Sequence, residues 1–171
     1  IDFVDIDSST GLMSIEKLRF KLKEALLKNK LPKVLIPVHL AGSSCDMAEI
    51  FKLSEEYGFS IIEDASHAIG GKYKGELVGS CRYSNITIFS FDPVKIITSG
   101  EGGIVTTNNE LVAQKIKELR SHGITKQKDR FKYPSEGDWY YEQQDLGFNY
   151  RLTDIQAALG LSQLERLEKI I

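Results

Sequence analysis

The feature that most constrains the fold is an alternation of short apolar runs with an amphipathic segment of helical length. Residues 33–40 (KVLIPVHL) and 60–65 (SIIEDA) are apolar runs of strand length. Between them, residues 46–58 carry apolar side chains at helical spacing, behind a capping aspartate and before a glycine. Parallel strands need a connection of about this length. The sequence therefore predicts an α/β fold, with a mainly parallel sheet and helices on both faces.

Further segments extend this pattern. Residues 3–7 (FVDID) alternate apolar and acidic residues, which is typical of a half-buried strand. Ser14 is the expected cap of a helix whose apolar residues follow helical spacing. After a glycine-rich turn region at residues 70–79, two more strands are expected at residues 86–91 and 103–107.

In the second half of the chain, the sequence predicts a helix followed by a long segment without regular secondary structure. The helix is expected at residues 110–122, with Leu111, Ile116 and Leu119 facing inward. Residues 123–145 are polar and aromatic without a clear period. Loops of this length are usually functional or mobile, so we expect no core element there.

The chain begins beside one predicted element and ends inside another. The first residue is Ile1, shortly before the alternating segment, and the last helix, with Thr153 as its expected cap, runs to Ile171. We therefore expect residues 1–171 to be the central portion of a larger domain of a longer protein.

The composition argues against several kinds of partner. The 171 residues include 42% hydrophobic and 27% charged residues, and the formal net charge is -2. This balance gives no electrostatic basis for binding nucleic acid or an anionic membrane. No apolar run approaches the ~20 residues of a membrane span. Two cysteines, Cys45 and Cys81, form neither a disulfide framework nor a metal motif, so we expect a cytoplasmic protein without a metal site.

Two polar residues follow the second apolar run. Asp64 ends that run, and in parallel sheets ligands bind at the carboxyl ends of the strands. A carboxylate there can keep a ring nitrogen protonated, although it could also cap a helix or join a surface ion pair. His67 could stack on a ligand ring or bond to it. It could equally be satisfied by the backbone of its own turn.

Ser90 and Lys95 stand in the segment FSFDPVKIITSGEGG, between an apolar strand and a glycine-rich loop. A lysine held partly out of water becomes neutral more readily and can form a Schiff base. Glycines permit tight turns and the close approach of a ligand. The alternative is an exposed loop lysine, and a glycine-rich loop alone is weak evidence.

Other polar residues leave both a functional and a structural interpretation open. Asn149 and Arg151 precede the last helix, where an amide and a helix start can bind phosphate, but they also suit a simple turn. The aromatic residues of 138–143 (DWYYEQ) could cover a sugar or a uracil, or pack a loop. We expect a packing role for His39 and a helix-end role for His122.

Five segments, taken in order, resemble the DegT/DnrJ/EryC1/StrS family of sugar aminotransferases. They are residues 37–42 (PVHLAG), 61–75 (IIEDASHAIGGKYKG), 86–109 (ITIFSFDPVKIITSGEGGIVTTNN), 120–124 (RSHGI) and 146–164 (LGFNYRLTDIQAALGLSQL). The resemblance implies the large domain of an aspartate-aminotransferase-type enzyme that depends on pyridoxal 5'-phosphate (PLP). Within the family, the sequence resembles an enzyme that makes precursors of pseudaminic acid.

The resemblance also implies a reaction and a partner. The amino group of L-glutamate would move to C4 of a UDP-4-keto-6-deoxy-N-acetylhexosamine, on a homodimer. Other nucleotide sugars of the family, and a scaffold that only binds a nucleotide sugar, remain alternatives. A NAD-linked dehydrogenase would need a G-x-G-x-x-G turn in the first half of the chain, and none occurs there.

The resemblance assigns a role to each matching residue. Lys95 would hold the cofactor covalently and carry the proton, and Asp64 would pair with the ring nitrogen. His67 would contact the ring, and Ser90 would bind the phosphate. Asn149 would reach the phosphate of the neighbouring subunit.

Two details of the sequence bear on this resemblance. Asp92 stands where the family usually has a histidine, and the family's amino-terminal Gly-Thr phosphate loop and carboxy-terminal small domain have no counterpart here. Relatives that dehydrate sugars replace the lysine with histidine, so Lys95 favours transamination.

Overall fold

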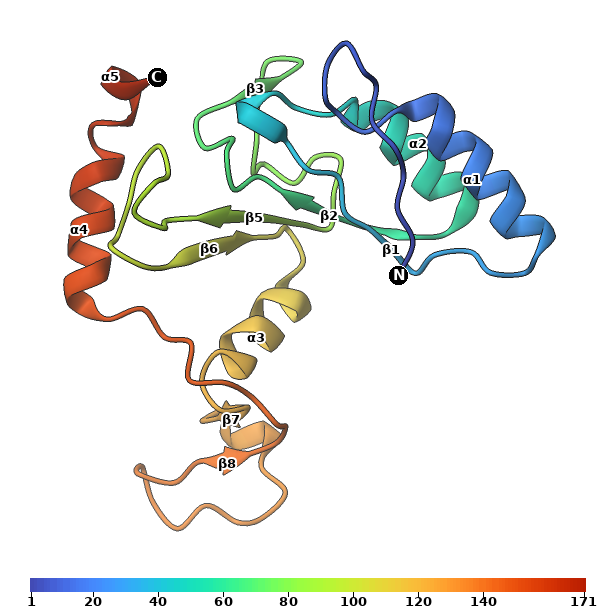
Figure 1. The fold of residues 1–171 in the computed structure, drawn as a ribbon. Helices are drawn as coiled ribbons and strands as arrows, with labels where there is room; N and C mark the ends of the chain where they lie inside the picture. The colour runs from blue at the N-terminus through green and yellow to red at the C-terminus, as the bar shows by residue number, and fades with distance from the viewer. The chain divides into compact units, whose positions relative to one another are not determined.

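The computed structural model describes residues 1–171 and contains two compact units (Figure 1). One unit comprises Ile1–Asn108 together with Asp154–Ile171, and the other comprises Asn109–Thr153. None of the helices is long and apolar enough to cross a membrane.

The first unit is built on a four-stranded sheet with the order β1-β2-β5-β6. The strands are β1 (Val34–Leu35), β2 (Ser60–Asp64), β5 (Ile86–Ser90) and β6 (Gly103–Thr106). β1, β2 and β5 are parallel, whereas β6 pairs with β5 in the antiparallel sense. The predicted α/β class with a mainly parallel sheet is therefore confirmed, with one antiparallel edge strand.

The first strand is shorter than the apolar run at residues 33–40 predicted. After Leu35, only an isolated bridge between Val38 and Asp64 continues the pairing with β2. Pro37 explains the interruption, because proline has no backbone N–H to donate to a ladder. Its carbonyl still accepts the N–H of Asp64 at 2.9 Å.

Two helices begin and end where the sequence predicted. α1 (Ile15–Leu27) is capped by Ser14, whose hydroxyl accepts the N–H of the third residue on. α2 (Met47–Tyr57) is capped in the same way by Asp46, and it ends at Gly58 in the left-handed conformation. These caps satisfy backbone groups that a helix end leaves unpaired.

The main core lies between these helices and one face of the sheet. Leu18 and Leu22 of α1 meet Ile50 and Leu53 of α2 and Ile61 of β2 there. Burying each of these side chains stabilises the fold by about 1.5–3 kcal/mol.

The opposite face of the sheet keeps large apolar side chains exposed. Side chains alternate between faces along a strand, and on this face Ile36, Val38, Ile88 and Val105 are 39–54% exposed. Helices were expected on both faces. That expectation is wrong for this chain, because α1 and α2 cover only the first face.

A hairpin occupies the glycine-rich region before β5. β3 (Lys72–Tyr73) and β4 (Glu76–Leu77) pair in the antiparallel sense. Lys74 and Gly75 both have positive φ angles, as the two central residues of a type I′ turn require. Because the turn is local and its glycine is permissive, this part of the chain folds back without a long loop.

The last helix is interrupted rather than continuous. α4 (Asp154–Leu164) begins directly after Thr153, as expected, but α5 (Leu167–Ile170) is separate. A Cβ added at Gly160 of α4 would lie 3.3 Å from Ser99, and α5 lies against Gly70. Both helices therefore contact the remainder of the first unit, to which they belong, although no side chain of α4 is buried.

The strand predicted at residues 3–7 is not formed. Phe3 is 79% exposed, and only a bridge between Ile6 and Met13 is present. Acidic side chains of this segment bind locally instead, as Asp5 does to Lys17 at 2.5 Å. Apolar and acidic residues do alternate in this segment, but no neighbouring strand pairs with it.

The second unit contains α3 (Glu110–Leu119) and a two-stranded sheet of β7 (Ile124–Thr125) and β8 (Glu142–Gln143). The sheet gives order to a segment for which no element was expected. The inward placement of Leu111 is also wrong, because this side chain is 77% exposed. Glu118 is the buried residue of the helix, and it binds Arg130.

Candidate active site

Asp64 and Ser90 lie on the same face of the sheet, at the carboxyl ends of neighbouring parallel strands. Asp64 of β2 is in register with Ile88 of β5, and Ser90 stands two residues further on. Because side chains two apart share a face, Ser90 and Asp64 point to the same side. One oxygen of Asp64, Oδ1, accepts the N–H and O–H of Ser66, at 3.1 and 2.6 Å. The structure therefore places both residues where ligands bind in parallel sheets.

Lys95 follows the end of β5 in a tight turn. The N–H of Asp92 donates to Ser90 Oγ at 3.4 Å, and the N–H of Lys95 donates to the carbonyl of Asp92 at 3.0 Å. The Asp92 carboxylate accepts the N–H of Val94 at 3.3 Å. Lys95 is half-buried. The turn thus holds the lysine close in sequence and in space to the strand end that carries Ser90.

The loop after Lys95 is anchored to the same strand end. The carbonyl of Phe91 accepts the Thr98 hydroxyl at 2.9 Å and the Ser99 N–H at 3.1 Å. Gly103 is the residue paired with Ser90 across the β5–β6 ladder. A Cβ there would lie 2.8 Å from the carbonyl oxygen of Phe89, so this close approach of two backbones needs glycine.

His67 is exposed and has a backbone partner. Its Nδ1 accepts the N–H of Ala41 at 3.4 Å. Ala41 and Gly42 both have positive φ angles, and a Cβ on Gly42 would lie 3.2 Å from the His67 carbonyl oxygen. The turn in PVHLAG therefore packs against the loop that carries His67. Contact of this histidine with a ligand ring remains a prediction.

Asn149 belongs to the other unit and is exposed. It forms an isolated bridge with Ser121. Its neighbours Phe148 and Tyr150 stack their rings with centroids 4.8 Å apart. The structure gathers Asp64, His67, Ser90 and Lys95 in one unit, and the phosphate contact of Asn149 stays a prediction.

Sequence reasoning missed a buried polar cluster under the same strands. His39 is 0% and Glu63 5% exposed, and His39 Nε2 lies 2.7 Å from Glu63 Oε2. The other carboxylate oxygen accepts the Thr87 hydroxyl at 2.9 Å and the hydroxyl of Ser84. A signal was present, because Glu63 shares the core-facing positions of β2 with Ile61, and an acid in such a position needs partners.

The charge of this cluster resides on Glu63. Burial by itself would raise the pKa of Glu63, but hydrogen bonds from His39, Ser84 and Thr87 outweigh burial and lower the pKa below its usual range. The carboxylate is therefore ionised at neutral pH and fully bonded within the protein.

Opposing effects act on His39. Burial favours the neutral ring, whereas the hydrogen bond with Glu63 and the charge of that carboxylate act to raise the pKa of His39. The backbone N–H of Cys45 donates to Nδ1 at 3.2 Å, so this nitrogen is an acceptor and carries no proton. From this contact we assign the neutral ring, with its proton on Nε2 facing Glu63.

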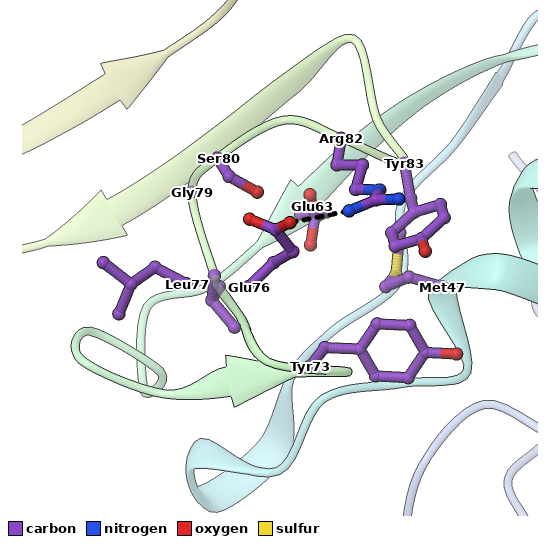
Figure 2. A pocket seen from close by; sticks show the side chains of 10 residues that line it. Met47, Glu63, Tyr73, Glu76, Leu77, Gly79, Ser80, Arg82 and Tyr83 are labelled. Carbon is purple, nitrogen blue, oxygen red and sulfur yellow. Dashed lines mark hydrogen bonds and ion pairs between the residues drawn. The ribbon is translucent and has the colours of Figure 1, made fainter.

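A cavity of about 20 Å³ adjoins Glu63. Figure 2 shows the side chains that line it, including Glu63 and the Glu76–Arg82 ion pair at 2.6 Å. A cavity of this volume holds about one water molecule. It is far below the ~300 Å³ of a small-molecule site, so it is too small to hold a cofactor itself.

Residues 2–171 match the sequence pattern of the DegT/DnrJ/EryC1/StrS aminotransferase family. The chain is 47% identical over 167 residues to the uncharacterized protein MJ1066 of Methanocaldococcus jannaschii, covering 97% of the chain and 41% of that protein. It is 42% identical over 169 residues to the UDP-4-amino-4,6-dideoxy-N-acetyl-beta-L-altrosamine transaminase of Campylobacter jejuni, covering 98% and 41%. It is also 40% identical over 166 residues to GDP-perosamine synthase of Caulobacter vibrioides, covering 97% and 40%. The chain thus spans about two fifths of these relatives.

Solved structures agree with the sequence relatives. PseC of Helicobacter pylori, an aminotransferase of pseudaminic acid biosynthesis, matches with a TM-score of 0.83 and 32% identity, over 98% of this chain and 40% of that chain. The PLP form of the putative sugar aminotransferase Spr1654 of Streptococcus pneumoniae matches with a TM-score of 0.73 and 29% identity, over 97% and 43%. Aminotransferases of this family depend on PLP. By sequence and by structure, the chain belongs to the DegT/DnrJ/EryC1/StrS aminotransferase family.

Proposed function

We propose that the protein containing this chain transfers an amino group from L-glutamate to C4 of a UDP-4-keto-6-deoxy-N-acetylhexosamine. The observation that carries the proposal is the placement of three residue types at one sheet edge. Asp64 and Ser90 share a face at neighbouring strand ends, and Lys95 follows Ser90 in a tight turn. An acid, a hydroxyl and an amine in this arrangement suit a PLP enzyme.

The residues present fit the cofactor. When bound, PLP supplies an electron sink for the substrate carbon that loses or gains a proton. Asp64 would hold the ring nitrogen, because its Oδ2 makes no hydrogen bond within the chain while Oδ1 is fixed by Ser66. The Ser90 hydroxyl would donate to the phosphate. Lys95 would hold the cofactor and move the proton with its flexible amine.

Asp92 is compatible with this site although the family usually has histidine there. An acid beside a phosphate would repel it. The Asp92 carboxylate accepts the N–H of Val94 in its own turn, so it has a local role.

We propose that the chain is the central portion of the PLP-binding large domain. Its relatives are more than twice as long. The exposed apolar sheet face around Ile36, Val38 and Ile88 supports this proposal, because such a surface is normally covered in a complete domain. The Gly-Thr phosphate loop and the small domain would come from other segments of the longer protein.

A homodimer is part of the proposal, with Asn149 reaching the phosphate of the neighbouring subunit. Asn149 is exposed, and so are its sequence neighbours Phe148 and Tyr150, which suits contact with another chain. The free thiols of Cys45 and Cys81, both buried, suit the reducing cytoplasm.

The choice of nucleotide is the finer part of the proposal. The UDP-sugar transaminase of Campylobacter jejuni and the GDP-perosamine synthase of Caulobacter vibrioides are 42% and 40% identical to the chain. A GDP-linked keto-sugar is therefore the second candidate. The 42% identity to the UDP-sugar transaminase, together with the structural match to PseC, an aminotransferase of pseudaminic acid biosynthesis, supports the UDP-linked sugar.

The test uses the full-length protein with PLP, L-glutamate and either keto-sugar. We expect visible absorbance from covalently bound PLP, its loss on adding glutamate, and its return with the UDP-linked sugar but not with the GDP-linked sugar. Lys95→Ala should abolish the absorbance, and the exposed-lysine control Lys33→Ala should retain it. Return with the GDP-linked sugar alone would identify the second candidate. Absence of PLP binding by the wild type would leave a nucleotide-sugar-binding scaffold.

A further inference from the structure

We propose that His39 and Glu63 are positioning residues, which hold the strand ends so that Asp64 and Ser90 keep the spacing that the cofactor needs. This inference rests on the proposed function. It concerns a buried cluster on the face of the sheet opposite to the candidate site, and none of its side chains belongs to that site.

The cluster ties three neighbouring chain segments together through one carboxylate. Glu63 of β2 accepts a hydrogen bond from His39 on the β1 side, at 2.7 Å. On the β5 side it accepts the Thr87 hydroxyl at 2.9 Å, and it also accepts the hydroxyl of Ser84. Each bond crosses from one segment to the next. The separation of the strand ends is therefore fixed by side chains as well as by the ladder.

The β1 side needs such a bond because its ladder is incomplete. Only Val34 and Leu35 form β1, and Pro37 cannot donate to β2. The N–H of His39 donates to the Asp64 carbonyl at 2.9 Å, while its ring bonds to Glu63. His39 therefore bonds to two consecutive residues of β2, Glu63 and the candidate acid Asp64.

The β5 side sets the position of the phosphate residue. Thr87 and Ser90 stand on opposite faces of β5, three residues apart. The Thr87–Glu63 bond therefore fixes Ser90 relative to Asp64, which is the next residue after Glu63. PLP is a rigid ring with a phosphate arm, so its two ends require a set distance between these residues.

If the cluster around Glu63 only stabilised the fold, packed apolar side chains could replace it. Replacing a buried charged cluster by packed hydrophobic residues is often neutral or stabilising. A bonded cluster instead specifies one register, and a slip of one residue would turn Asp64 to the other face. A role in positioning Asp64 and Ser90 therefore explains why the side chains of this cluster are polar.

The experiment measures PLP binding by the full-length protein and its variants. Thr87→Val removes the hydroxyl and keeps the shape, whereas Thr87→Ser keeps the hydroxyl. We expect Thr87→Val to raise the Kd for PLP about tenfold, because a displaced Ser90 would lose one hydrogen bond to the charged phosphate, and Thr87→Ser to stay within about twofold. Thr87→Val should also shift the pH titration of the bound cofactor's visible absorbance.

A core variant separates positioning from loss of stability. Leu22→Ala leaves a cavity in the main core, away from the cluster. It should lower the urea midpoint at least as much as Thr87→Val, without changing the Kd or the pH titration. Ser84→Ala, which removes the other hydroxyl bond to Glu63, gives a second variant if Thr87→Val does not fold.

The outcomes are distinct. Equal effects of Thr87→Val and Leu22→Ala on PLP binding, or no effect of either cluster variant, would overturn the positioning role while the proposed function stands. A wild-type protein that binds no PLP would overturn both. Weaker binding and a shifted titration in the cluster variants alone would support the inference.

Discussion

Asp64 and Glu63 are consecutive residues of β2, and their side chains lie on opposite faces of the sheet. Glu63 is buried among hydrogen-bond donors on the helix-covered face. Asp64 is half-buried on the open face and keeps Oδ2 without a partner in the chain. The two adjacent acids thus have different surroundings, and the role proposed for each can be tested.

Asp64→Asn should slow the reaction while leaving PLP bound. The amide keeps an oxygen for Ser66 but cannot hold a protonated ring nitrogen, so transamination should fall on the order of 100-fold. Single-turnover loss of cofactor absorbance with glutamate measures the rate. Glu55→Gln, at an exposed position of α2, is the control and should react as the wild type does. An unchanged rate in Asp64→Asn would show that Asp64 does not pair with the ring nitrogen of the cofactor.

Ser90→Ala should weaken cofactor binding. Loss of one hydroxyl donor to a charged phosphate is expected to raise the Kd for PLP about tenfold. Equilibrium dialysis with PLP measures the change. Ser80→Ala, at an exposed serine, should have the Kd of the wild type. Equal affinities for all three proteins would mean that Ser90 makes no phosphate contact.

Gly103→Ala should destabilise the fold through a backbone clash. The added Cβ would lie 2.8 Å from the Phe89 carbonyl oxygen, and relief of such a contact is expected to cost about 1–3 kcal/mol. Urea unfolding of the full-length variant, compared with Glu101→Ala in the same exposed loop, measures this effect. A stability equal to that of the wild type would show that β5 and β6 separate easily.

Stability should depend on pH through Glu63. Its pKa in the folded protein lies below its usual value, so the unfolded chain binds the proton more readily. The stabilisation is therefore present above the unfolded pKa of about 4.3 and is lost as pH falls through the folded pKa. Glu63→Gln should unfold at lower urea than the wild type at pH 7, and its midpoint should fall less between pH 5 and pH 3. Parallel pH profiles of the two proteins would contradict this assignment.

Local signals were read correctly because they act over a few residues. The caps at Ser14 and Asp46 and the stop at Gly58 depend only on neighbouring backbone groups. The apolar runs around Ile61 and Ile88 were predicted as strands from their own composition, and the structure pairs them with each other.

Features that depend on distant partners were missed. The bond between His39 and Glu63 joins residues 24 apart in the chain, and neither residue's own neighbours predict it. The segment around Phe3 alternates like a strand but meets no partner edge. The antiparallel direction of β6 likewise depends on the loop after Lys95, which returns at once to the same strand end.

The candidate site was predicted in part. Asp64 and Ser90 were placed by their positions at strand ends, and the structure puts them on one face. His67 does bond to a backbone N–H, but that of Ala41 in a different turn and not that of its own turn. Asn149 belongs to the other unit, and its contact with the phosphate of a neighbouring subunit stays a prediction.

The most direct test is visible absorbance of the full-length protein saturated with PLP, before and after borohydride reduction, compared with Lys95→Ala and Lys33→Ala. We expect borohydride reduction to fix the cofactor covalently to the wild type and to Lys33→Ala, and not to Lys95→Ala, in which any remaining absorbance belongs to non-covalent PLP. Cofactor fixed to Lys95→Ala to the same extent as to the wild type, or no fixation in the wild type, would show that Lys95 does not hold the cofactor.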